Sequence, residues 1–170
     1  MSVVPPGAAL PSTGPRRRAR PARPVELARG AWGLLLLGAP RTVLRPMVPG
    51  GPAPLAVGVV RVLGARQLAQ AALSGSSPSP EVLALGAWVD GVHAATSLGL
   101  VGAEPRCARA GLADAAVALV WSGFGLRSLQ QAGAALDRPP GLRDALAVAV
   151  LSRVPAGAPL LARAREARAA

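Results

Sequence analysis

The feature that most constrains this chain is an apolar run from Val82 to Ala103, because a helix of that length covers a bilayer core of ~30 Å. Asp90 and His93 are its only ionisable side chains, and both lie near its centre. Charged groups at that depth are costly and usually face a partner helix, a cavity or a functional site. The run therefore predicts a membrane-spanning helix with one polar face.

Composition supports a single membrane domain rather than a soluble one. Hydrophobic residues make up 51% of the 170 residues, which exceeds ordinary soluble usage, and 20 glycine and 18 proline residues favour short, interrupted helices. A net charge of +11 would suggest nucleic acid as the partner of a soluble chain. Here the arginines flank apolar runs, so we expect a bilayer with anionic headgroups as the partner and no nucleic acid.

The first 48 residues divide into a tail and a helix that does not span. Residues 1–24 are proline-rich with unbalanced arginines, which predicts a disordered basic tail. Residues 25–48 predict an amphipathic helix lying in the membrane interface, because its apolar stretch is too short to cross. Trp32 would lie at the headgroup level of that helix.

Residues 55–154 predict the bundle itself. Its spans are expected at about 55–73, 81–103, 110–126 and 141–154, followed by a basic tail over 155–170. The fold class is thus an all-α integral membrane bundle with three or four short transmembrane helices and an N-terminal interfacial helix. The last predicted span, 141–154, is short, so three and four spans both remain open. The first predicted span, 55–73, is marginal because it carries Arg61 and Arg66, and the alternative is a helix on the membrane surface.

Arginine placement predicts a multi-pass protein of the cytoplasmic membrane with a cytoplasmic N-terminus. Arginines surround the predicted N-terminal helix, whereas the 74–80 segment, SGSSPSP, has no charge. If the first span begins in the cytoplasm, that uncharged loop lies outside.

Counting from the loops places two arginines at the depth of two carboxylates. Arg66 and Asp90 are predicted within ~3 Å of one depth in antiparallel neighbours, and so are Arg61 and Asp114. Pairing removes much of the cost of burying each charge. Asp90, His93 and Ser97 also share one helical face. The predicted buried polar cluster comprises Arg61, Arg66, Gln70, Asp90, His93, Ser97 and Asp114.

Two further patterns concern packing. Small residues at every fourth position of the 81–103 helix would let another backbone approach closely; these are Ala87, Gly91, Ala95, Gly99 and Ala103. Trp88 and Trp121 fall near the predicted outer ends of their spans and are expected as interfacial anchors.

The chemistry that these residues offer is limited. Asp90 and His93 could form a proton or metal site, but a single histidine favours a structural hydrogen bond. No cofactor, metal or catalytic residue is indicated, and an enzyme is not expected, because the chain lacks a nucleophile elbow and a phosphate loop.

One stretch resembles a known group. A G-A-R-Q-L-x-Q helix from Gly64 to Gln70, followed by a D-x-x-H helix at Asp90 and His93, is similar to small uncharacterised integral membrane proteins of high-GC Gram-positive bacteria. The resemblance implies a multi-span fold and supplies no activity. We therefore expect a non-enzymatic component that assembles with itself or a membrane partner. The alternative is a proton- or metal-coupled carrier subunit using Arg66, Asp90 and His93.

Overall fold

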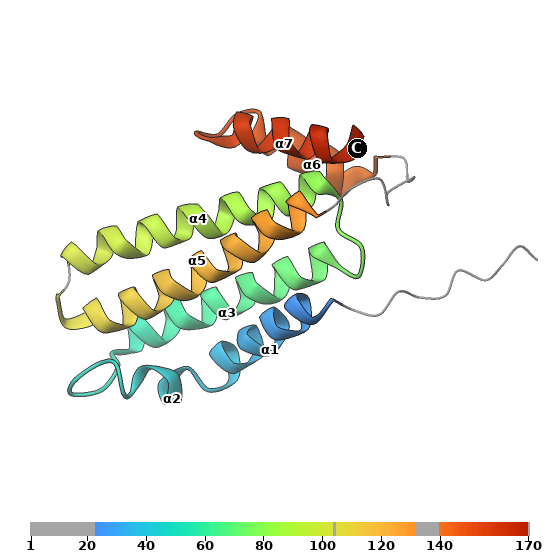
Figure 1. Ribbon diagram of the computed structural model, residues 1–170. Helices are drawn as coiled ribbons and strands as arrows, with labels where there is room; N and C mark the ends of the chain where they lie inside the picture. Colours follow the sequence, from blue (N-terminus) through green and yellow to red (C-terminus); the bar gives the residue numbers. More distant parts are fainter. Residues whose placement is uncertain (1–22, 104, 132–139, 170) are drawn as a thin grey trace, which may run out of the picture.

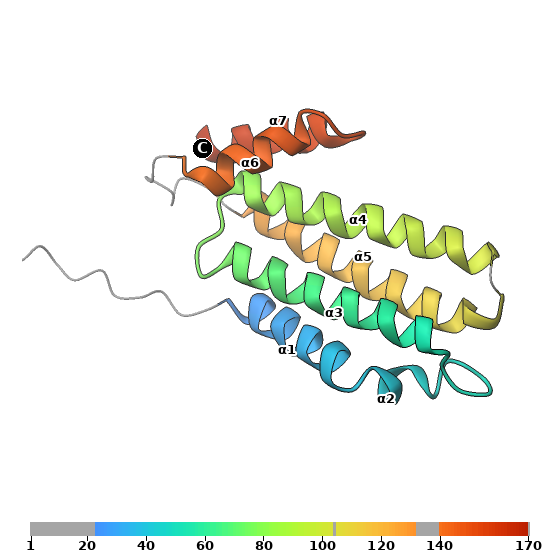
Figure 2. The ribbon, with the colours of Figure 1, turned by 180° about the vertical axis from the view of Figure 1, so that it is seen from behind.

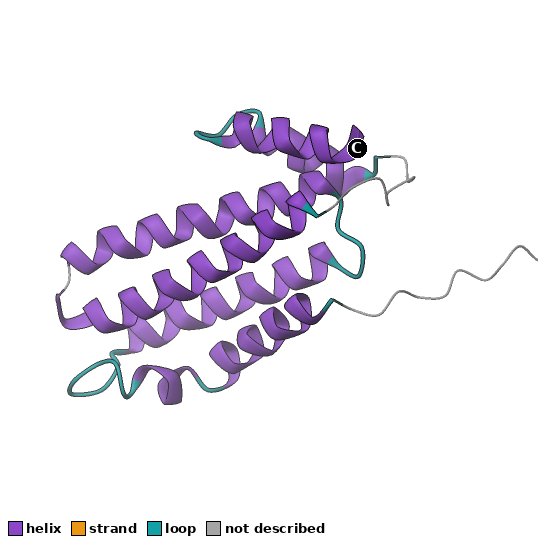
Figure 3. Ribbon diagram, in the orientation of Figure 1, coloured by secondary structure: helices purple, strands orange, loops and turns teal. Residues whose placement is uncertain are grey.

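A computed structural model describes residues 23–103, 105–131 and 140–169, and these are helical apart from short links (Figure 3). The predicted all-α class is confirmed for these residues. Residues 1–22 of the predicted basic tail lie outside the described part.

The helices begin mainly at prolines, whose fixed φ and missing N–H suit the first turn. Proline is the first residue of the first four helices: α1 (Pro24–Gly38), α2 (Pro40–Leu44), α3 (Pro54–Ser74) and α4 (Pro80–Ala103). A short 3-10 turn, η1 (Pro105–Cys107), then leads into α5 (Ala108–Gln130), which is followed by α6 (Leu142–Leu151) and α7 (Gly157–Ala169).

Two helix pairs form the bundle (Figures 1 and 2). α1 packs along α3, α4 packs along α5, and few backbone contacts join one pair to the other. The start of α1 and the 75–79 loop lie at one end, which we call end A. α2 and η1 lie at the opposite end, which we call end B. Side chains must therefore hold the two pairs together.

The α1–α3 pair approaches through two glycines. A Cβ on Gly33 would lie 2.9 Å from the Gly64 carbonyl oxygen, and one on Gly64 would lie 2.7 Å from the Gly33 carbonyl oxygen. Both distances are shorter than van der Waals contact with backbone atoms, so neither position has room for a larger residue.

The small-residue stripe of α4 contacts α5 over half of its length. A Cβ on Gly125 would lie 3.2 Å from Ala87 Cβ, and Ser122 Oγ donates a 3.0 Å hydrogen bond to the Ala87 carbonyl oxygen. Ala95 and Gly99 are exposed, so the prediction of a contact along the whole stripe is wrong at that end.

α6 and α7 form a short hairpin beside α4 (Figure 1). Leu151 and Leu161 of the hairpin pack in one hydrophobic cluster with Leu83 of α4 and Leu129 of α5. The region expected as a basic tail, 155–170, thus contributes a packed helix that the sequence did not reveal. Because α7 returns to end A, α6 does not continue across the bundle as the expected 141–154 span would.

The N-terminal helix also differs from its prediction. A single interfacial helix was expected over 25–48, but α1 ends at Gly38 and Pro40 begins the separate α2. Glu26, Arg29 and Leu36 of α1 are buried in the bundle. They are covered by other helices because α1 packs along α3 rather than lying apart from it.

One segment of the described chain, Pro105–Gln130, is long and apolar enough to cross a membrane, judged by length and composition alone. Only 22% of its apolar window is buried. Over their described residues, α3 and α4 do not meet the same criterion.

Candidate functional site

A buried carboxylate joins the two helix pairs. Asp90 of α4 is fully buried and accepts a 2.9 Å hydrogen bond from Arg29 Nη2 and a 2.8 Å bond from Arg66 Nη2, one on each carboxylate oxygen. Arg29 belongs to α1 and Arg66 to α3, so one side chain of α4 binds both helices of the other pair. The structure thus brings Arg66 and Asp90 together, as loop counting predicts.

Arg29 has the most contacts of the cluster. Its Nη1 donates to Gln67 Oε1 at 3.3 Å, and its Nε lies 3.9 Å from Glu26 Oε2. Its guanidinium carbon lies 5.0 Å from the centre of the Trp121 ring, close enough for a cation–π interaction. Two carboxylates and an aromatic ring therefore surround one buried cation, which offsets its desolvation.

A second polar group lies between α4 and α5. His93 Nε2 is 2.8 Å from Asp114 Oδ2, and Ser97 Oγ donates a 2.7 Å hydrogen bond to the same oxygen. The histidine contact is close but not aligned as a hydrogen bond. It becomes an ion pair only when the ring is protonated.

Arg61 does not join the cluster. Its side chain is exposed on α3, and the Arg61–Asp114 pair expected from loop counting is wrong. Asp114 contacts the two polar residues of α4 instead. Loop counting fixes the position of a residue along the helix axis but not the direction in which its side chain leaves the helix, which explains the error.

Several cluster residues were not predicted from the sequence. Arg29 and Glu26 come from α1, where the buried residues Glu26, Arg29, Gly33 and Leu36 recur at spacings of three and four. That period marks one helical face and was the available signal. Trp121 was expected as an interfacial anchor, yet it is buried against Arg29.

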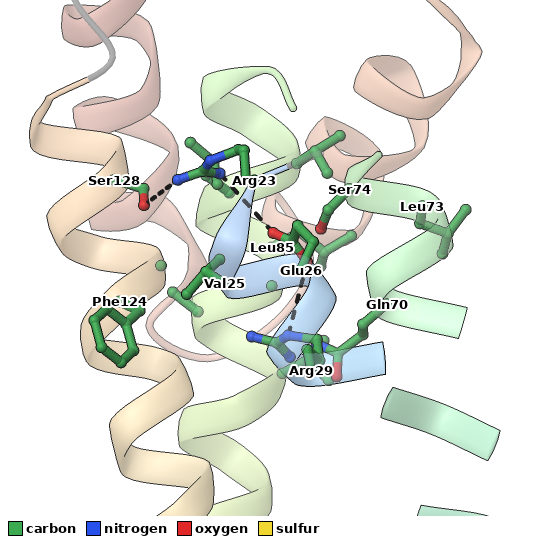
Figure 4. A pocket seen from close by; sticks show the side chains of 16 residues that line it. Arg23, Val25, Glu26, Arg29, Gln70, Leu73, Ser74, Leu85, Phe124 and Ser128 are labelled. Atoms are coloured by element: carbon green, nitrogen blue, oxygen red, sulfur yellow. Dashed lines mark hydrogen bonds and ion pairs between the residues drawn. The ribbon is translucent and has the colours of Figure 1, made fainter. Parts of the chain in front are cut away.

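A cavity of about 140 Å³ separates the two pairs towards end A (Figure 4). Arg23 lines it from just before α1, Glu26 from α1, Gln70 from α3, and Ser128 from α5, where Ser128 accepts a hydrogen bond from Arg23. Gln70 Oε1 has no hydrogen-bond partner among the described residues. Gln70 therefore lines the cavity next to the cluster rather than bonding within it.

The α6–α7 hairpin is held by polar contacts at both ends. Arg168 of α7 donates two hydrogen bonds to Glu81 of α4, at 2.7 and 2.6 Å, and Glu81 raises the pKa of Arg168. At the turn between α6 and α7, Trp88 Nε1 donates a 2.8 Å bond to the Pro155 carbonyl oxygen. Trp88 thus positions the hairpin, a role that its prediction as a membrane anchor did not include.

The cluster is suited to holding helices together. Within the described residues, no group of three or more histidine, cysteine, aspartate or glutamate side chains could hold a metal ion. Asp90 is bonded on both oxygens by arginines, which leaves it no role as a free base. In comparisons with known proteins, no family model, curated protein or solved structure matches this chain.

Proposed function

We propose that this chain is a multi-span membrane protein that acts as a non-enzymatic assembly or interaction component, with itself or with a membrane partner. The observation that carries the proposal is the reversed placement of polar and apolar side chains. Asp90 is 0% exposed, whereas Leu55 is 80% and Val62 is 69% exposed. In water this arrangement would leave apolar surface exposed, and the protein would forgo ~25 cal/mol of stabilising free energy for each Å² left unburied.

Exposed apolar side chains occur on most of the helices, which favours lipid over a single protein partner. They lie on five helices and include Leu34, Leu55, Leu98, Leu119 and Leu146. Lipid tails cover all faces of a bundle, whereas one partner covers one patch. The 21 residues of α3, 24 of α4 and 23 of α5 also give ~31–36 Å of helix each, enough for a bilayer core of ~30 Å.

The polar cluster supports a structural role. Hydrocarbon does not supply the hydrophobic drive that joins helices in water, so buried polar contacts and close backbone packing must do more. The buried polar contacts are those of Arg29 and Arg66 with Asp90, and the close backbone packing is that of Gly33 against Gly64. The resemblance of the 57–125 region to small uncharacterised integral membrane proteins of high-GC Gram-positive bacteria accords with this proposal.

Fractionation of bacterial cells expressing the full chain tests the proposal. We expect the protein in the membrane pellet after a carbonate wash at high pH, which strips peripheral proteins, and in solution only after detergent is added. A tagged soluble protein of similar charge, expressed beside it, controls for trapping by the pellet. Recovery of the chain in the supernatant before or after the wash would refute membrane insertion.

A second candidate, a proton-coupled carrier subunit, is favoured by one contact. His93 and Asp114 lie 2.8 Å apart, and an imidazole beside a carboxylate can act as a proton shuttle. In vesicles containing the protein and a pH-sensitive dye, such a carrier would conduct protons, and H93Q would abolish the flux while S122A, in the same interface, would not. Equal flux with and without protein would remove this candidate.

A further inference from the structure

We propose that the α6–α7 hairpin binds anionic lipid headgroups through Arg153, Arg163 and Arg165, and that end A therefore faces the cytoplasm. This inference rests on the proposed membrane function and adds the residues that bind the anionic headgroups and the orientation of the bundle. It reverses the side predicted for the 74–80 segment, which forms part of end A.

The orientation follows from which segments share an end. The 75–79 loop, the start of α1, the end of α5, the start of α6 and the end of α7 all lie at end A, and the hairpin runs from there beside α4 to a turn at Trp88 (Figures 1 and 2). Because α1 runs along α3 instead of lying in the interface, the start of α1 lies at the same end as that loop. The original prediction placed them on opposite sides.

Arginine is concentrated at end A. Arg23 lies at the start of α1. Arg127 near the end of α5, Arg143 at the start of α6, and Arg165 and Arg168 near the end of α7 add to it on the described elements. End B carries the smaller set of Arg41, Arg45, Arg106 and Arg109. Arginine near membrane crossings is retained in the cytoplasm, so the larger set marks the cytoplasmic side.

The hairpin has the surface that an anionic membrane interface requires. The outward side of α6 is apolar, with Leu142 78% and Leu146 56% exposed. The outward side of α7 carries exposed Arg163 and Arg165, and Arg153 is exposed at the turn. An apolar face beside a basic one is the pattern of helices that lie at the headgroup boundary.

Internal contacts leave these three arginines available while fixing the hairpin. The acids that face the hairpin from α4 and α6 are engaged: Glu81 binds Arg168, and Asp144 accepts a hydrogen bond from Ser79. Arg153 donates to the carbonyl oxygen of Ala149, one turn earlier, which still leaves its positive charge exposed. Glu166 is the only exposed acid on the described part of α7. The hairpin surface is thus net positive where phosphate would lie.

Lipid selectivity of the full chain tests the headgroup site. Reconstituted vesicles would carry spin-labelled phosphatidylglycerol or phosphatidylcholine, and electron spin resonance would give the relative association of each lipid with the protein. We expect preference for phosphatidylglycerol. The triple variant R153Q/R163Q/R165Q should lower that preference by at least about fivefold, since one arginine near an anionic surface is worth that factor. The matched triple variant at end B, R41Q/R45Q/R106Q, should lower it less.

Equal effects of the two triple variants, or no lipid preference in the unaltered chain, would overturn the headgroup site. Reporter fusions test the orientation separately. A phosphatase that is active only in the periplasm should be inactive after Ser77 and active after Gly50, which lies in the exposed end B loop. Activity after Ser77 with none after Gly50 would overturn it. Both tests use protein that resists the carbonate wash, so failure of membrane insertion would be recognised first.

Discussion

Replacing Asp90 by asparagine should destabilise the bundle strongly, because one carboxylate neutralises two arginines of the opposite helix pair. Asp90 is fully buried, and the side chains of Arg29 and Arg66 are 8% and 22% exposed. Breaking a buried ion pair by removing one partner costs about 3–5 kcal/mol, since the remaining charge stays desolvated. Glu26 still lies 3.9 Å from Arg29 and Arg66 reaches solvent in part, so we expect about 3 kcal/mol for D90N.

The assay is reversible unfolding in mixed detergent micelles, followed by tryptophan fluorescence, because Trp121 lies directly against Arg29. The exposed variant E166Q on α7 serves as the control and should change the free energy of unfolding by less than about 0.5 kcal/mol. A loss below about 1 kcal/mol for D90N would refute the reasoning, since single hydrogen bonds alone reach that size.

A companion variant distinguishes two causes of the expected loss: the missing attraction between Asp90 and the arginines, and the cost of leaving those arginines buried without a carboxylate. In R29M/R66M/D90L, apolar side chains replace all three charged groups. Such replacements of buried ion networks are often neutral or stabilising. We therefore expect the triple variant to be more stable than D90N, although it has lost more hydrogen bonds. A triple variant less stable than D90N would mean that the ion pairs themselves contribute net stability.

Three further predictions use matched variants and the same unfolding assay. G64A should lower the free energy of unfolding by about 1–3 kcal/mol, because its new methyl group would meet the α1 backbone at 2.7 Å. G58A, in the same helix, would meet no atom within 4 Å and should raise the free energy of unfolding by about 0.5–1 kcal/mol. Equal effects would contradict the close α1–α3 approach. R66Q should destabilise by roughly 1–3 kcal/mol and the exposed R61Q by less than about 0.5 kcal/mol, and the reverse order would contradict the assignment of Asp90 to Arg66. R168Q should release α7 from Glu81 and speed its proteolysis without unfolding the bundle, while unchanged cleavage would mean that apolar packing alone holds the hairpin.

Much of the helical layout could be predicted from the sequence because apolar run length and proline placement determine it. The 55–73 and 81–103 predictions agree with α3 and α4 to within a residue or so at each end. α5 runs four residues beyond its predicted end, because Arg127 and Gln130 are good helix formers that an apolarity criterion excludes.

Inter-helix contacts were harder to predict. Arg66 and Asp90 form the expected pair, but Arg61 is exposed and Arg29 takes a central place. Arg29 was overlooked because the short apolar stretch of α1 suggested an interfacial helix, whereas the Gly33–Gly64 approach lets α1 pack deep against α3. Long-range packing of this kind depends on shape, which hydrophobic pattern alone does not encode.

Photolabelling from within the bilayer tests the central claim most directly. With the full chain in vesicles, a carbene precursor carried on a lipid tail would label the residues that face hydrocarbon. The account predicts labels on Leu112, Leu119 and Val120, the exposed face of α5, and none on Ala115 and Ala118, its buried face. Labels on neither face, with the chain washed from the vesicles by carbonate, would contradict a bundle that buries its charges and turns its leucines to lipid.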